Sequence, residues 1–390
     1  MKITKVTAYV LKVPLGDKRF FSSQCAFPER NSLLVRIDTD EGIYGWGEGG
    51  QYGPAEPVKC VIEKVLAPMI LGKDPLDKGV LWDHMYQMTR DFGQKGTYIE
   101  AISAIDVALW DICGKALGVP VAKLLGGVKR EAIAAYATGC YYRGEDYLDL
   151  KSLLPALRDE AAGYVDMGFD MLKFKVGLLS VEQDAKRVET IREAVGEDVT
   201  LFCDCNHAYN AYTAIRMAKH LEQANVLFME EPVPPEDHDG YRRVRESCRI
   251  AIAAGECEYT AFGFKNFIAK GCIDIAQPDI SCAGGLTEFQ RILAVAGVHG
   301  VSVLPHVWGS GIALATAIHA IASMPLYPHT ANPVGLQNEP VIEYDRNFNP
   351  LRDELLKENI RFENKRVALP EGAGLGVDVD MDVLKKYCVE

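Results

Sequence analysis

Three short apolar stretches decide how this chain folds: VTLFCD at 199–204, VLFME at 226–230 and IAIAAGE at 250–256. Each stretch ends in an acid, and Asp204, Glu230 and Glu256 follow one another at intervals of 26 residues. That interval holds one strand, one loop and one helix, so it predicts successive βα units of a parallel barrel. Equivalent positions on such strands converge at the C-terminal mouth of the barrel, which is where we expect the three acids to meet.

Three converging carboxylates predict a metal site. They repel one another strongly unless a divalent cation lies between them. All-oxygen ligands favour a hard ion, Mg²⁺ before Mn²⁺ or Ca²⁺. Any one of these acids could instead cap a helix or lie in a solvated loop, but their common phase in the repeat favours the metal site.

The alternation of strands and helices extends outward from these stretches, starting at Glu131. Strands are predicted at 132–138, 171–176, 199–204, 226–230, 250–255, 273–277 and 301–305. Helices are predicted at 181–195, 211–224, 237–247, 259–270, 286–298 and 311–323. The eighth strand is poorly marked and lies between Thr330 and Tyr344. Polar residues end every strand in turn, which favours a (β/α) barrel over a doubly wound sheet.

The first 128 residues follow a different pattern, with strands followed by helices. Strands are predicted at 1–13 and 31–39, then a turn and the stretch IYGWGE at 43–48. Helices are predicted at 55–69, 80–88 and 99–117, which together indicate an α+β domain. The tail, 350–390, shows a helical piece at 352–358 and turns rich in glycine and proline, and it could fold back on this domain.

The string Gly45-x-Gly47-x-x-Gly50 matches a dinucleotide-binding fingerprint and would suggest an NAD-dependent oxidoreductase. It follows a hairpin strand, however, and it opens no helix before Pro54. The string therefore does not favour a dinucleotide site, and no organic cofactor is expected.

Composition narrows the class of protein. Of 390 residues, 48% are hydrophobic and 25% charged, which is typical of a soluble globular protein. A net charge of -12 argues against nucleic acid and anionic membranes as partners. The N-terminus lacks the apolar core of a signal peptide, and no stretch is long enough to span a membrane. The eleven cysteines form no zinc pattern, so we expect reduced thiols in the cytoplasm.

Further candidates for chemistry lie at the other strand ends. Lys173 and Lys175 alternate with Phe174 in MLKFKVG, so both lysines are expected to point into the barrel. Neighbouring ammonium groups disfavour each other's charge, so we expect one of them to lose its proton more readily and to serve as a base. The alternative is a pair of lysines on a surface strand.

Asp279 and His306 end the next two strands and predict a hydrogen-bonded dyad, in which the carboxylate orients the imidazole and raises its basicity. Trp308 follows and could wall the site or pack within its loop. The mouth would then hold lysines on one side, a metal in the middle and a histidine opposite. A small carboxylate substrate bound there would have its α-proton flanked by two bases.

Taken together, these motifs resemble the enolase superfamily, mandelate racemase subgroup. The likeness covers almost the whole chain and is carried by TDEGIYGWGE (39–48), SAIDVALWDICGKALGVPVAKLLGG (103–127), KFKVG (173–177), DCN (204–206), EEP (230–232), GE (255–256), QPD (277–279) and PHVWG (305–309). It implies the α/β fold class, with a modified TIM (β/α)7β-type barrel at 129–349. It also implies an N-terminal α+β capping domain at 1–128, completed by the C-terminal segment 350–390.

Carried over residue by residue, the resemblance makes Lys175 the base on one side and Lys173 the partner that sets its pKa. It makes His306 the acid or base on the opposite side and Asp279 the group that orients it. Which base acts first depends on the configuration at the α-carbon. The implied metal ligands, for one Mg²⁺ per subunit, are Asp204, Glu230 and Glu256.

The resemblance also implies residues that contact the substrate. Glu343, in VIEYD, would hydrogen-bond a carboxylate oxygen of the intermediate, with Glu339 as a rival because the eighth strand is faint. Asn206 would lie beside the metal. The specificity loops of this family come from the capping domain, here near 20–27 and 49–53. The candidates are Phe21, Ser22, Ser23 and Tyr52 from the cap and Trp308 from the barrel.

The shared chemistry of the family is removal of a proton α to a carboxylate, through an enediolate that the metal stabilises. The stretches PHVWGSG (305–311), YATG (136–139) and EYDRNFNPLR (343–352) most resemble members acting on acid sugars and their lactones. We therefore expect dehydration of an acid sugar or cycloisomerisation of its lactone, by a lyase or intramolecular lyase. The polar cap candidates, including Gln24 and Gln51, suit a hydroxylated substrate.

Other functions remain open at this point. A racemase or epimerase of a hydroxy acid or amino-acid derivative would use Lys175 and His306 on opposite faces. A non-catalytic barrel would be expected to lack some of the catalytic positions, and none of them is replaced here. Relatives are commonly homo-oligomers, so the resemblance also implies an oligomer, for which an octamer is plausible.

Overall fold

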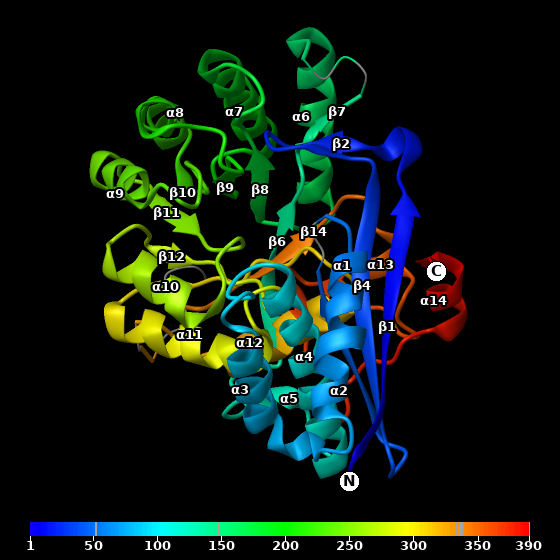
Figure 1. Ribbon diagram of the computed structural model, residues 1–390. Coiled ribbons are helices and arrows are strands. Elements are labelled where there is room, and N and C mark those ends of the chain that lie inside the picture. The colour runs from blue at the N-terminus through cyan, green and yellow to red at the C-terminus, as the bar shows by residue number, and fades with distance from the viewer. Residues whose placement is uncertain are drawn as a thin grey trace.

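The structure is a computed structural model that describes every residue except 51, 52, 145, 147, 329, 332, 333, 335–337 and 390. Its elements form a strand-and-helix barrel against which the N-terminal strands and helices pack (Figure 1). Within the described part of the chain, no helix combines the length and apolar character that crossing a membrane requires.

The barrel is built on one ladder of parallel strands that runs in the order β14-β6-β8-β9-β10-β11-β12-β13. The strands are β6 (Ala132–Thr138), β8 (Met171–Lys175), β9 (Thr200–Asp204), β10 (Val226–Glu230), β11 (Ala251–Ala254), β12 (Ile275–Ala276), β13 (Ser302–Val303) and β14 (Ile342–Asp345). The strand order agrees with the prediction from sequence. Strand β14 falls at the end of the interval predicted for the eighth strand. Among the described residues, no ladder joins β13 to β14.

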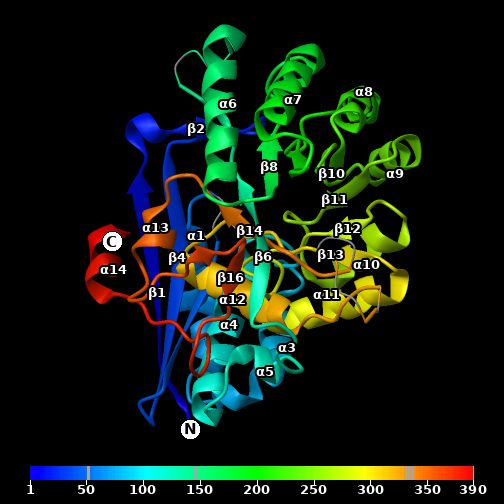
Figure 2. The ribbon, with the colours of Figure 1, turned by 180° about the vertical axis from the view of Figure 1, so that it is seen from behind.

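Helices follow the strands and cover the outside of the ladder (Figures 1 and 2). They are α6 (Leu150–Asp166), α7 (Val181–Val195), α8 (Ala211–Gln223), α9 (His238–Ser247), α10 (Thr260–Ala269), α11 (Gly285–His299) and α12 (Gly311–Ser323). Polar N-caps start several of them; Ser180, for example, accepts from the Gln183 N–H in a capping box at the start of α7. The sequence prediction lacked α6, which carries Pro155 near its start.

The N-terminal region pairs β1 (Ile3–Pro14), β4 (Glu29–Thr39) and β5 (Tyr44–Gly49) in an antiparallel sheet. Its helices are α1 (Glu56–Val61), α2 (Ala67–Ile70), α3 (Lys78–Thr89) and α4 (Thr97–Leu117), with a π-helical turn at Ile62–Leu66 between the first two. A short helix, α5 (Val121–Leu124), leads from this region into the barrel.

The glycine string of β5 is explained by helix packing. A Cβ on Gly45 would lie 2.1 Å from the Ala108 carbonyl oxygen, and a Cβ on Gly47 would lie 2.0 Å from that of Ala104. Since both carbonyls belong to α4, these glycines allow the buried helix to lie directly on the strand. This accounts for the string without a dinucleotide.

The C-terminal segment contacts both parts of the molecule. It contains α13 (Pro350–Asp353), β15 (Phe362–Glu363), β16 (Arg366–Ala368), α14 (Met381–Tyr387) and β17 (Cys388–Val389). Strand β17 pairs with β1, so the tail does return to the N-terminal sheet. Strand β16 pairs instead with β6 of the barrel. The helical piece predicted at 352–358 is wrong in extent, because α13 starts at Pro350 and ends at Asp353, and α14 was not predicted.

Glu48, at the end of β5, joins the N-terminal sheet to the barrel. Its buried carboxylate accepts hydrogen bonds from the Ser32 hydroxyl (2.6 Å), the Ser310 N–H (2.8 Å) and hydroxyl (2.5 Å), and the Ala313 N–H (2.9 Å). Ser310 is the N-cap of α12 and Ala313 lies in its first turn, where the helix dipole favours a carboxylate. These hydrogen bonds hold the loop that precedes α12 against the N-terminal sheet.

His319, buried in the middle of α12, gives a prediction about stability. Its Nδ1 accepts a hydrogen bond from the Ala122 N–H at 3.2 Å, and burial lowers its pKa from 6.5 to about 4. Because the folded pKa lies below the unfolded one, this contribution to stability is complete above pH 6.5 and is lost as the pH falls to 4. We expect protonation of His319 to lower the free energy of unfolding by about 3 kcal/mol between pH 6.5 and pH 4.

Urea unfolding of the wild type and His319→Asn between pH 8 and pH 4 checks this. Asparagine keeps an acceptor for the Ala122 N–H but does not titrate, so the difference between the two proteins should shrink as the pH falls. Parallel stability curves for the two proteins would contradict the assignment.

Candidate active site

Asp204, Glu230 and Glu256 meet at the C-terminal ends of neighbouring strands. Asp204 ends β9 and Glu230 ends β10, where the two residues are paired in register, and Glu256 lies just beyond β11. Their side chains are 0%, 1% and 7% exposed, and one carboxylate oxygen from each lies within 4.8 Å of the other two. The structure therefore brings together the three residues predicted as metal ligands.

The charges at this point suit a divalent cation. Burial raises the pKa of Glu230 to about 8, with a further contribution from Asp204. Burial likewise raises the pKa of Glu256 to about 7, helped by the neighbouring Glu231. Carboxylates that resist ionisation this strongly are relieved by a positive charge between them, and their all-oxygen donor set fits Mg²⁺.

Both lysines of β8 point into the barrel, as their alternation predicted. Lys173 Nζ donates to Glu230 Oε1 at 2.8 Å and Oε2 at 3.0 Å, and it lies 2.8 Å from Glu343 Oε1. Lys175 Nζ forms an ion pair with Asp204 Oδ2. All five side chains of β8 are buried, so a surface strand is excluded.

The expected loss of a proton from one of these lysines is wrong for this arrangement. Burial opposes the charged form of Lys175, but the attraction of Asp204 outweighs it and holds the pKa well above its usual value. The pKa of Lys173 is raised in the same way, chiefly by Glu230 and Glu343. The lysines compensate carboxylates more strongly than they repel each other.

His306 and Asp279 form the predicted pair. His306 Nδ1 lies 2.6 Å from Asp279 Oδ2, and its Nε2 lies 3.2 Å from Glu256 Oε2. Burial opposes a charge on this imidazole, but Glu256 and Asp279 raise its pKa to about 10. The imidazole is therefore held by carboxylates on both ring nitrogens and carries a proton at neutral pH.

The eighth strand places Glu343, and not Glu339, at the mouth. Glu343 is buried and accepts from the Thr138 hydroxyl at 2.6 Å and from the Val307 N–H at 3.2 Å. Lys173 lowers its pKa to about 2 against the effect of burial. Glu339 precedes the opposite end of β14, where it pairs with Arg366 at 3.2 Å.

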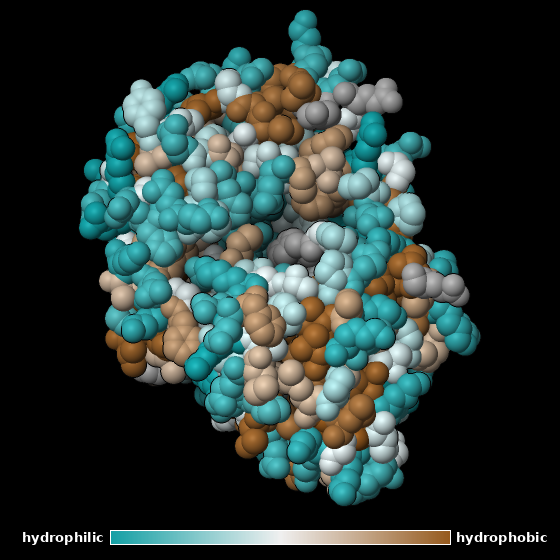
Figure 3. Space-filling view, viewed as in Figure 1, coloured by the Kyte–Doolittle hydropathy of each residue, from teal (hydrophilic) through white to brown (hydrophobic). Residues whose placement is uncertain are grey.

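A cavity of about 580 Å³ opens above these groups, between the barrel and the N-terminal sheet. Lys175, Asn206, Glu256 and His306 line it from the barrel side, together with Tyr141 and Trp308. The cap side is formed by Gln24–Asn31 and Lys12. Figure 3, drawn in the same view as Figure 1, shows a hollow near the centre of this face of the molecule. Lys175 and His306 thus line the same cavity from different strands.

The cap candidates do not all reach this cavity. Ser23 donates its hydroxyl to the Cys205 carbonyl at 2.6 Å, and Ser22 is buried within the turn that joins β2 (Phe20–Phe21) to β3 (Ala26–Phe27). Phe21 pairs with Tyr142 of β7 (Tyr142–Arg143). Gln51 and Tyr52 lie outside the described residues. The lining comes from the next few residues along the same loop.

Several residues of the site were not predicted from sequence. Gln277 donates to Glu230 Oε2 at 2.7 Å, and Tyr141 places its ring centroid 4.9 Å from Lys175 Nζ. Arg30 stacks on Trp308 with its guanidinium carbon 4.2 Å from the ring centroid. Gln277 could have been found, because it stands in the same QPD motif as Asp279. Tyr141 and Arg30 give no such signal, since neither stands in a motif or at a distinctive spacing.

A second cluster adjoins the acids. His207 Nε2 lies 3.0 Å from Glu231 Oε2 and 3.6 Å from Cys257 Sγ, and the three ligand atoms are close enough to hold a metal ion. Burial opposes the charge on His207, but Glu231 raises its pKa to about 9. A protonated histidine therefore balances the buried Glu231 beside the three-acid site.

Known families match most of the chain. Residues 6–126 match the N-terminal domain of the mandelate racemase and muconate lactonizing enzyme family. Residues 156–383 match the family described as enolase C-terminal domain-like. Together the two matches confirm the predicted fold class, a capping domain followed by a (β/α)7β barrel.

Characterised relatives are similar over nearly their full length. D-galactarolactone cycloisomerase of Agrobacterium fabrum is 38% identical over 390 residues, which cover 99% of each chain. Arabinonate dehydratase of Saccharolobus solfataricus is 38% identical over 355 residues, covering 91% of this chain and 90% of the relative. Among solved structures, the 3,6-anhydro-D-galactonate cycloisomerase from Zobellia galactanivorans has a TM-score of 0.88 and 43% identity over 100% of both chains.

Proposed function

The chain belongs to the mandelate racemase and muconate lactonizing enzyme family of the enolase superfamily, and from this we propose that it eliminates a β-oxygen from a small acid sugar. The reaction begins with removal of the proton α to the carboxylate. When the β-oxygen is a hydroxyl, the reaction is a dehydration. When it is the ring oxygen of a lactone or anhydro sugar, the ring opens and the reaction is a cycloisomerisation. The named relatives of this chain include enzymes of both kinds.

One observation carries this proposal: Lys175 and His306 line the same cavity and flank the three acids. Lys175 contacts Asp204 at one end of the row, and His306 lies 3.2 Å from Glu256 at the other. A substrate carboxylate held at the acids would present its α-carbon between the two side chains. This is the geometry that proton transfer on both faces of that carbon requires.

Mg²⁺ bound by Asp204, Glu230 and Glu256 would supply the positive charge that stabilises the negative charge developing on the substrate carboxylate. The chain's own groups add to this. Lys173, held between Glu230 and Glu343, keeps a fixed positive charge beside the acids. Glu343 is ionised beside Lys173 and fixes the position of that ammonium group.

The two flanking residues suit different halves of the elimination. His306 carries a proton at neutral pH and can give it to the departing oxygen from Nε2, while Asp279 holds Nδ1. Before that, Lys175 in its neutral form takes the α-proton. Its contact with Asp204 favours the charged form, so a ligand that draws Asp204 away would lower the pKa of Lys175 and make the neutral amine available.

The second candidate function is racemisation or epimerisation, favoured by the same pair of residues. Two groups on opposite sides of one carbon can exchange a proton without loss of oxygen. The reaction of the intermediate, and not the geometry of the bases, separates the two functions.

The test is a panel of acid sugars with purified protein and Mg²⁺ in D₂O, followed by proton NMR and a 2-keto acid assay. The panel contains aldonates, anhydro-aldonates, aldarolactones and amino-acid derivatives. A keto acid or rearranged ring, lost in His306→Asn and kept in the matched control Glu339→Gln, would support elimination. Deuterium at the α-carbon without elimination would support the epimerase, and neither signal on any compound would overturn the proposal.

We further propose that the enzyme works in the cytoplasm as a homo-oligomer, with an octamer as the form to test. All eleven cysteines are free, which suits a reducing compartment. Light scattering with size-exclusion chromatography measures the assembly directly.

A further inference from the structure

The part of the cavity lining that lies outside the acids and the two flanking bases has a defined character. We call it the distal wall, formed by Lys12, Phe27, Glu29, Arg30, Tyr141 and Trp308. We infer that the distal wall selects an acid sugar with one carboxylate, whose far end is uncharged, and rejects the diacid of the same length. This inference rests on the proposed function, because it assumes that the first carboxylate binds at the three acids.

The cations of the distal wall are already paired. Lys12 Nζ lies 2.7 Å from Glu56 Oε1 and 3.9 Å from Glu29 Oε1, so one positive charge faces two negative ones. Arg30 Nη2 lies 2.7 Å from Asp345 Oδ2. The other cations that line the cavity, Lys175 and His306, contact Asp204, Glu256 and Asp279. Among the described lining residues, every cation thus has a carboxylate partner.

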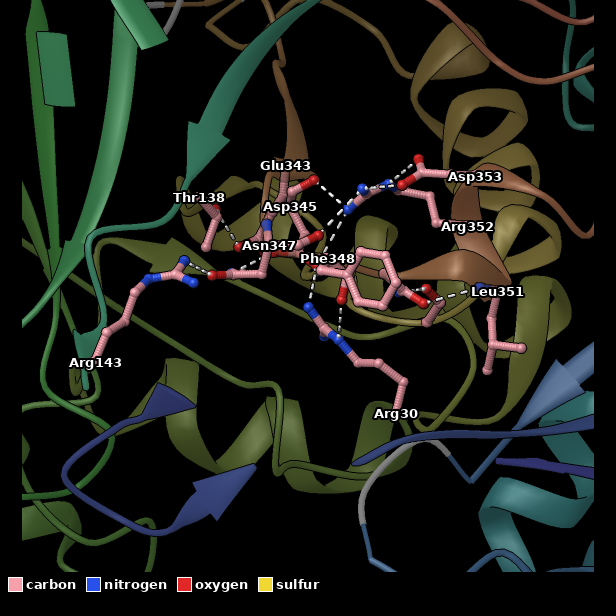
Figure 4. Close-up of polar contacts among 12 residues, drawn as sticks. Arg30, Thr138, Arg143, Glu343, Asp345, Asn347, Phe348, Leu351, Arg352 and Asp353 are labelled. Carbon is pink, nitrogen blue, oxygen red and sulfur yellow. Dashed lines mark hydrogen bonds and ion pairs between the residues drawn. The ribbon is translucent and has the colours of Figure 1, made fainter. Parts of the chain in front are cut away.

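Arg30 is also held in place, so it cannot turn to meet a second carboxylate. It is 3% exposed, and its Nε donates to the Phe348 carbonyl at 3.2 Å. Asp345 is shared with Arg352, whose Nη1 lies 3.2 Å from the same Oδ2 (Figure 4). Trp308 covers one face of the Arg30 guanidinium. Moving the guanidinium would leave the buried Asp345 with one partner fewer, at a large cost.

The rest of the distal wall is aromatic. The Phe27 and Trp308 ring centroids are 5.5 Å apart, and those of Tyr141 and Trp308 are 5.9 Å apart. Aromatic faces pack well against the C–H surface of a sugar, but they do not replace the water around a carboxylate. The aromatic surface and the excess acid near Lys12 both act against a second negative charge.

The test compares galactonate and galactarate, which differ only at C6, a hydroxymethyl group in one and a carboxylate in the other. Binding of each to the Mg²⁺-loaded protein is measured by calorimetry at low salt, independently of turnover. We expect galactonate to bind at least about tenfold more tightly, because like charges brought together at a site weaken binding. Higher ionic strength should narrow the difference, since Glu29 and Glu56 are partly exposed.

A charge variant sharpens the comparison. Glu56→Gln leaves Lys12 with only the more distant Glu29, so we expect galactarate to bind severalfold more tightly and galactonate to change little. The matched control is Glu63→Gln, which removes the partner of Lys59 outside the cavity and should leave both affinities unchanged.

The possible results distinguish a failure of the inference about the distal wall from a failure of the proposed function. Equal or tighter binding of galactarate by the wild type would overturn the inference, while turnover of any acid sugar would leave the proposed function standing. An unchanged ratio in Glu56→Gln would overturn the role assigned to Lys12 and its acids. Failure of both compounds to bind would overturn the inference together with the placement of the first carboxylate.

Discussion

Substitution of Lys175 by methionine will abolish turnover of the acid-sugar substrate, with kcat falling by about 10³-fold or more. Methionine fills a similar volume in the buried strand, so the protein should fold, but it cannot accept or hold a proton. Steady-state kinetics with Mg²⁺ and the incorporation of deuterium at the α-carbon measure the loss. A variant that retained wild-type kcat would exclude Lys175 from the reaction.

His306→Asn serves as the companion variant for this experiment. If Lys175 removes the α-proton, this variant should still exchange deuterium at the α-carbon while elimination fails. If His306 removes it, exchange should be lost in His306→Asn as well. The two variants together therefore assign the base, which the position of the residues on either side of the acids leaves open.

Removal of the divalent metal will silence the enzyme and lower its melting temperature. Asp204, Glu230 and Glu256 bring three carboxylates to one buried point, and burial raises the pKa of Glu230 to about 8. A cation bound there stabilises the folded state by about 2.7 kcal/mol when its concentration is a hundred times the Kd. Differential scanning calorimetry with EDTA, and then with excess Mg²⁺, measures the shift.

The variant for this prediction is Glu230→Gln, which keeps the shape of the side chain but removes one of the three charges. We expect its melting temperature to respond little to Mg²⁺ and its activity to fall by about 10³-fold or more. Glu339→Gln, outside the cavity, is the control and should respond as the wild type does. An equal response of Glu230→Gln and wild type to Mg²⁺ would contradict the assignment of this acid as a ligand.

Much of the barrel could be predicted because its sequence is locally explicit. Strand and helix alternate in short apolar runs. The acid at the end of VTLFCD points the same way as the acid that ends VLFME, because the two occupy equivalent positions on neighbouring parallel strands. The pattern failed where local signals are weak. Helix α6 carries Pro155, a residue that normally breaks helices, and β14 follows a stretch without alternation.

Glycines in β5 show the opposite case, in which a clear string had a different cause. Gly45 and Gly47 satisfy the spacing of a nucleotide loop, yet they are required because α4 lies on the strand at van der Waals distance. Spacing alone does not distinguish a glycine that approaches a phosphate from one that approaches a helix.

By itself, the sequence determined the order of the strands, the phase of the three acids and the inward direction of Lys173 and Lys175. These follow from the fixed periods of strands and βα units. Only the tertiary structure decided the charge state and surroundings of those residues. Electrostatic energies depend on distances between strands, so the expected acidity of a lysine reversed once Asp204 and Glu230 lay beside the two ammonium groups. The pairing of Arg30 with Asp345 likewise joins residues far apart in the chain, and no local pattern encodes such a contact.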